Sequence, residues 1–126
     1  MPKTVPNGPG LEPGPYPFSK VVEANGFVFL AGQVGDAPDS HGAVPGGIEP
    51  ETRAMLDNVG QLLEAVGLGF GDVVKCTVYM RDFADFAAFN AVYREYFPTE
   101  PPARATVGVT ALAADFSVEI EVLAAR

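Results

Sequence analysis

Arg104 is the side chain in this sequence best suited to hold a small anion. It follows Pro101-Pro102-Ala103 and enters a segment with two valines. A guanidinium grips a carboxylate through two parallel hydrogen bonds, which fix its position as well as neutralise its charge. The alternative is a surface or interface salt bridge between Arg104 and a glutamate. Arg104 is therefore a candidate anion-binding residue, with the salt bridge left open.

Glu119 is the candidate proton-transfer group. It lies among valine and isoleucine in the segment Val118–Val122. Partial burial would raise the pKa of its carboxyl and make it a proton donor or acceptor near neutral pH. A solvated glutamate on an exposed sheet face is the alternative, and Glu121 shares that face as a competing candidate.

The other candidate residues give weaker indications of a functional site. Asn90 shares a helical face with Tyr93, where its amide must be hydrogen-bonded either to backbone groups or to a ligand. Cys76 has no neighbouring histidine to activate it, so a small buried side chain is expected. His41 has no His or Cys at ligand spacing. Gly32–Gly35 is too short for a dinucleotide-binding fingerprint. We therefore predict no metal site and no cofactor.

Composition restricts the class of protein. The chain has 126 residues, 48% of them hydrophobic, and a net charge of −8. This predicts one domain over residues 1–126. Eight scattered basic residues argue against a nucleic-acid partner. No apolar stretch reaches the roughly 20 residues of a membrane span, and no signal segment is evident. With one cysteine, a cytoplasmic location is expected.

The predicted elements follow the order β-β-α-β-α-β-β. Residues 1–15 form an irregular N-terminal arm, and Asn25-Gly26 predicts a tight hairpin turn. Apolar spacing and the positions of proline and glycine place strands at 19–23, 27–33, 72–80, 103–109 and 118–123 and helices at 50–66 and 83–97. We expect an α+β fold in which both helices pack on one face of a mixed sheet.

Side-chain alternation predicts which residues share a sheet face. Four residues of the third strand are expected to share one face: Val74, Cys76, Val78 and Met80. On the last two strands, the polar or small residues are expected on the face away from the helices: Arg104, Thr106, Gly108, Glu119 and Glu121. Such a face often lines a cleft or contacts another subunit, so an oligomer is expected.

Several segments together resemble the RidA family, also called YjgF/UK114. The matching segments are residues 17–22, 28–35, 51–58, 71–79, 86–93, 102–107 and 118–121. The resemblance implies a chorismate-mutase-like fold, a homotrimer and ligand clefts between subunits. It also implies deamination of reactive enamines and imines, such as 2-aminoacrylate, to a 2-keto acid and ammonia.

The resemblance also implies roles for individual residues. Arg104 would bind the substrate carboxylate, and Glu119 would orient water or exchange protons at the imine. The cleft would be lined or supported by Phe18, Ala31, Gly32, Asn90 and Thr106.

Three of these positions depart from the family pattern. Ala31 stands where the active deaminases often have serine, Phe18 where tyrosine is frequent, and Thr106 where many members have cysteine. These departures keep a second function open, a non-catalytic trimer that binds or senses a small carboxylate or keto acid. An endoribonuclease is the least favoured reading because the chain is acidic.

Overall fold

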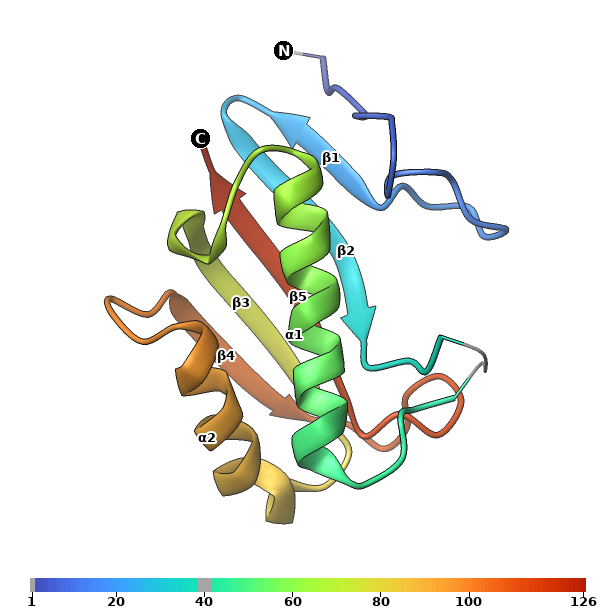
Figure 1. The fold of residues 1–126 in the computed structure, drawn as a ribbon, viewed down its shortest axis with the longest axis vertical. Coiled ribbons are helices and arrows are strands. Elements are labelled where there is room, and N and C mark those ends of the chain that lie inside the picture. The colour runs from blue at the N-terminus through green and yellow to red at the C-terminus, as the bar shows by residue number, and fades with distance from the viewer. Residues whose placement is uncertain (1, 39–41) are drawn as a thin grey trace.

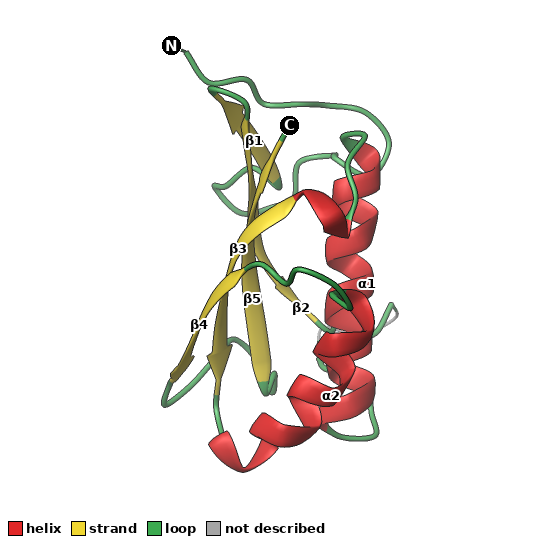
Figure 2. Cartoon of the chain, turned by 90° about the vertical axis from the view of Figure 1, so that its left-hand side faces the viewer, coloured by secondary structure: helices red, strands yellow, loops and turns green. Residues whose placement is uncertain are grey.

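The structure is a computed structural model that describes residues 2–38 and 42–126. The strands are β1 (Val21–Ala24), β2 (Phe27–Val34), β3 (Val73–Met80), β4 (Ala103–Gly108) and β5 (Val118–Ala125), and the α-helices are α1 (Ile48–Ala65) and α2 (Phe86–Tyr96). Figure 2 shows the sheet edge-on with both helices on the same side. The predicted element order and layer arrangement are confirmed. His41 lies outside the described residues.

The sheet has the strand order β1-β2-β5-β3-β4 and is mixed. Only β3 and β4 run parallel, and α2 connects them; the other neighbours are antiparallel. The last strand, β5, thus lies in the middle of the sheet, and the edge strands of the sheet are β1 and β4 (Figure 1). The core lies between the sheet and the helices and includes Met55, Leu63, Phe89 and Ile120, all fully buried.

Local turn chemistry explains several boundaries. Asn25 and Gly26 both have positive φ, at 53° and 80°, as the predicted hairpin turn requires. Gly67 has φ 78° just after α1, where its N–H donates to Glu64 and that of Leu68 donates to Leu63. The expected helix start at Pro50 is two residues late, since α1 begins at Ile48. Pro50 still lies in the first turn, where backbone N–H groups have no helical partner.

The predicted buried face of β3 is wrong at one residue. Val74 is exposed, whereas Val73 is buried beside Cys76 and Val78. The register between β3 and β5 shifts by one residue between Val73 and Lys75. This β-bulge turns Val74 outward, so simple alternation fails at that point.

The predicted face of Arg104 and Thr106 is also wrong. Arg104 pairs with Cys76 and Thr106 with Val78, both fully buried residues on the helix side of β3. Arg104 and Thr106 therefore face α2, whereas Ala105 and Val107 are exposed on the outer face. Alternation separates the two faces of a strand but does not say which one the helices cover.

The N-terminal arm is irregular except at one contact. Thr4 exchanges two backbone hydrogen bonds with Glu23, each 2.8 Å long, and so extends the edge of the sheet. Leu11, within the arm, is buried against the core. None of the helices in the described part of the chain is long and apolar enough to cross a membrane.

Candidate functional site

Arg104 lies under the aromatic face of α2. Its guanidinium carbon is 4.7 Å from the ring centre of Tyr93, 5.4 Å from that of Phe89 and 5.7 Å from that of Phe86. Rings hold a cation at these distances through their negative faces. Among residues 2–38 and 42–126, Arg104 has no carboxylate partner. The chain thus presents a half-buried guanidinium without an ion pair.

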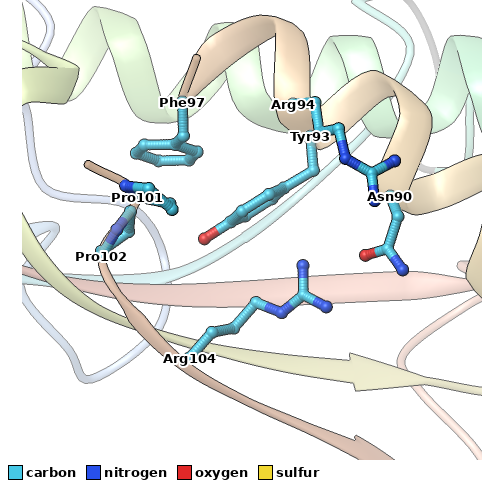
Figure 3. A pocket seen from close by; sticks show the side chains of 7 residues that line it. All are labelled: Asn90, Tyr93, Arg94, Phe97, Pro101, Pro102 and Arg104. Carbon is cyan, nitrogen blue, oxygen red and sulfur yellow. The ribbon is translucent and has the colours of Figure 1, made fainter. Parts of the chain in front are cut away.

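A hollow of about 290 Å³ opens beside this guanidinium. It is lined by Asn90, Tyr93, Arg94, Phe97, Pro101, Pro102 and Arg104 (Figure 3). In Figure 3 the Tyr93 hydroxyl points toward the two prolines, and the guanidinium groups of Arg94 and Arg104 lie on the side of Asn90. We call this the arginine hollow.

The Tyr93 hydroxyl is buried without a hydrogen-bond partner in the described part of the chain. The side chain as a whole is 6% exposed. The Cys76 thiol and the Arg104 guanidinium lie near enough to affect its ionisation, but neither makes a regular hydrogen bond with it. Burial raises the pKa of the hydroxyl and also that of the Cys76 thiol, so both stay protonated at neutral pH. Cys76 is fully buried, as expected, and is not a thiolate nucleophile.

Glu119 lies on the opposite face of the sheet, where it pairs with Tyr79 of β3 and Val34 of β2. Its neighbours Val118 and Ile120 are fully buried toward the helices. Burial raises the pKa of the Glu119 carboxyl, and the negative charge of Glu121 raises it further. Glu121 is itself engaged, since it accepts a hydrogen bond from the Tyr79 hydroxyl. The surroundings of the Glu119 carboxyl therefore favour its protonated form.

Gly32 makes room for the Glu119 carboxylate. The register between β2 and β5 shifts by one residue between Leu30 and Gln33, so Gly32 sits in a bulge. A Cβ placed on Gly32 would lie 2.1 Å from Oε2 of Glu119. Bulges re-aim side chains next to functional sites, and here the missing side chain lets the carboxylate lie against the backbone. Both residues line a second hollow, of about 240 Å³.

Phe18 and Ala31 lie close to Gly32. Phe18 is 61% exposed and lines a third hollow together with Gly32 and Lys20. The backbone N–H of Ala31 donates to the carbonyl of Lys20 at 2.9 Å. Gly32 lines both this hollow, which reaches α1, and the hollow of Glu119, so we group Phe18, Ala31, Gly32 and Glu119 as the glutamate half.

The other predicted site residues lie on the helix side of the sheet. Asn90 lines the arginine hollow with Arg104, and Thr106 follows two residues later on the same strand face. The described chain thus brings the predicted residues into two groups, Arg104 with Asn90 and Thr106, and the glutamate half. A single chain does not join the two groups in one cleft. The sequence reasoning missed Tyr93 as a polar member of the site because its ring fitted the pattern of a core residue.

The comparisons with known proteins agree on one family. A family model described as Endoribonuclease L-PSP matches residues 12–126. A RutC family protein of Pyrococcus horikoshii is 44% identical over 108 residues, covering 86% of each chain. The 2-iminobutanoate/2-iminopropanoate deaminase of Capra hircus is 42% identical and covers 87% of this chain and 80% of its own. The crystal structure of E. coli TdcF with bound serine has a TM-score of 0.83 at 34% identity, covering 94% of this chain and 96% of that one.

Proposed function

Because the chain belongs to the YjgF/RidA family, we propose that it hydrolyses 2-enamine and 2-imine acids, such as 2-aminoacrylate, to 2-keto acids and ammonia. Relatives at about 40% identity are named for deamination of 2-iminobutanoate and 2-iminopropanoate. One observation supports this function most: the Arg104 guanidinium has no carboxylate partner in the described chain and lies half-buried beside a hollow. Such a group suits the carboxylate that every substrate of this class has.

We place the active site between subunits of a homotrimer. Arg104 and Glu119 lie on opposite faces of one sheet, so the arginine hollow of one subunit would meet the glutamate half of its neighbour. The uncovered sheet face supports such an assembly, since it exposes four large apolar side chains, namely Phe27, Phe29, Val74 and Val107. Clustered exposed apolar residues are typical of interaction surfaces.

The reaction needs little from the protein beyond positioning. An imine carbon is electrophilic, and more so when its nitrogen is protonated. A water oxygen forms a bond to that carbon, and the C–N bond then breaks so that ammonia leaves and the carbonyl forms. Arg104 would hold the carboxylate and Glu119 would pass protons between the water and the nitrogen. Its raised pKa suits this exchange, and no hydroxyl is available from Ala31 or Phe18.

The direct test generates 2-aminoacrylate with an amino-acid dehydratase and follows keto-acid release with and without the protein. We expect faster release with the native chain and no acceleration with Arg104→Ala, which should keep its circular dichroism spectrum. The absence of acceleration by an intact oligomer would overturn the proposal.

A non-catalytic binding function is the second candidate because Ala31 and Phe18 lack the hydroxyls frequent in the family. Calorimetry with pyruvate and 2-oxobutyrate separates the two functions: binding without turnover favours sensing. RNA cleavage, which the name of the family model suggests, is less favoured since the chain carries a net charge of −8.

A further inference from the structure

Three of the five arginines have no acidic partner among residues 2–38 and 42–126. Arg53 pairs with Glu95 at 2.8 Å, and Arg126 pairs with Glu23 at 2.7 Å. Arg81 donates to the carbonyl of Ala114. Arg94 and Arg104 remain, although acidic residues outnumber basic ones by 16 to 8.

These two arginines line the same hollow. Arg94 comes from the exposed side of α2 and Arg104 from β4, and their guanidinium groups lie on the same side of the hollow in Figure 3. Two cations that line one hollow without an anionic partner favour a ligand with negative charge at both ends.

The hollow is open and reaches from Arg104 to Arg94, so a ligand longer than a three-carbon acid can contact both guanidinium groups.

We propose that the arginine hollow selects 2-imino and 2-keto dicarboxylates of four or five carbons. Arg104 holds the carboxylate next to the imine or keto carbon, and Arg94 is the specificity-determining residue that holds the distal carboxylate. The proposal deepens the proposed function, since it rests on Arg104 as the carboxylate-binding residue of that site.

The test compares two five-carbon acids that differ only at the distal end. Isothermal titration calorimetry of the intact protein measures binding of 2-oxoglutarate and of 2-oxopentanoate, which lacks the second carboxylate. We expect 2-oxoglutarate to bind about fivefold more tightly, the effect of one solvent-exposed ion pair. Arg94→Gln should abolish this preference and leave the affinity for 2-oxopentanoate unchanged. Lys3→Gln removes the same charge from an exposed position outside the hollow and should preserve the preference.

Equal affinities for the two acids in the native protein would overturn the proposal, as would equal weakening of both by Arg94→Gln. The proposed deaminase activity is judged separately with 2-aminoacrylate. An Arg94-dependent preference without imine hydrolysis would support the dicarboxylate site and refute the deaminase. Imine hydrolysis without that preference would support the deaminase and refute the dicarboxylate site.

Discussion

Arg104 and Glu119 lie on opposite faces of the same sheet. Arg104 pairs with the buried Cys76 on the helix side, whereas Glu119 pairs with Tyr79 on the outer side. The two side chains with the best chemistry for the proposed reaction therefore work together only if a second copy of the chain brings its outer face to the first chain's arginine hollow. The proposed reaction therefore depends on the proposed assembly.

Mixed oligomers should recover activity from two inactive variants. Arg104→Ala and Glu119→Gln should each be inactive alone, because each lacks one half of every site. When the two chains are refolded together in equal amounts, about a quarter of the sites in a cyclic trimer pair an intact Arg104 with an intact Glu119. Keto-acid release by the mixture measures this recovery. A mixture as inactive as its components would contradict a shared site.

Gly32→Ala should displace the Glu119 carboxylate. The new Cβ would meet Oε2 at 2.1 Å, and the flexible glutamate must move away. We expect a loss of activity approaching that of Glu119→Gln, with a change in the melting temperature of only a few degrees. Gly71→Ala is the matched control, since a Cβ there meets no atom within 4 Å. Equal activity of the two alanine variants would show that the contact does not matter.

The raised pKa of Glu119 predicts how stability depends on pH. Burial and the charge of Glu121 place this pKa above the ordinary glutamate value of about 4.3, so the folded state binds the proton more tightly than the unfolded state. This contribution to stability is fully present below the unfolded-state value and is lost as the pH rises through the folded-state pKa.

Glu119→Gln should therefore flatten the fall in stability over that range, and Glu121→Gln should flatten it less, since it removes only the second cause. Urea denaturation between pH 4 and pH 8 measures the difference. Parallel stability curves for Glu119→Gln and the native chain would rule out this role of the Glu119 carboxyl.

Glu51 ties the start of β5 to α1. Its side chain is 3% exposed, and Oε2 accepts hydrogen bonds from the backbone N–H groups of Ser117 and Val118 at 2.7 and 3.3 Å. Glu51→Ala leaves both donors unpaired and should lower the free energy of unfolding by about 2–4 kcal/mol. Glu51→Gln keeps an acceptor and should lose less than half of that. Thermal and urea denaturation compare the two variants, and equal losses would mean that packing rather than hydrogen bonding matters here.

The sequence predicted the positions of the helices, strands and turns better than the side of the sheet on which each strand residue lies. Asn25-Gly26 and Gly67 mark their turns because few residues tolerate positive φ, and the structure has them as expected. Val74 was assigned to the wrong face since a bulge depends on pairing with β5, a strand 44 residues later in the chain (from 74 to 118). Local alternation contains no information about such a partner.

The candidate site was predicted in part. The residue types of Arg104 and Glu119 make them candidates, which stay predictions, but the expectation that Arg104 turns away from the helices was wrong. Helix coverage is a tertiary property, which the strand sequence does not encode. The contact between Gly32 and Glu119 was not foreseen either, because it depends on a bulge in β2.

The central place of β5 has a consequence for how the protein is made. Synthesis runs from the N-terminus, so this strand leaves the ribosome after the other four, yet both β2 and β3 pair with it. Until then the β1–β2 hairpin and the β3–β4 unit have unpaired strand edges, a state open to chaperones and to aggregation. The nascent chain therefore gains its cooperative fold in one late step, and loss of the segment Val118–Ala125 would abolish the whole sheet rather than trim it.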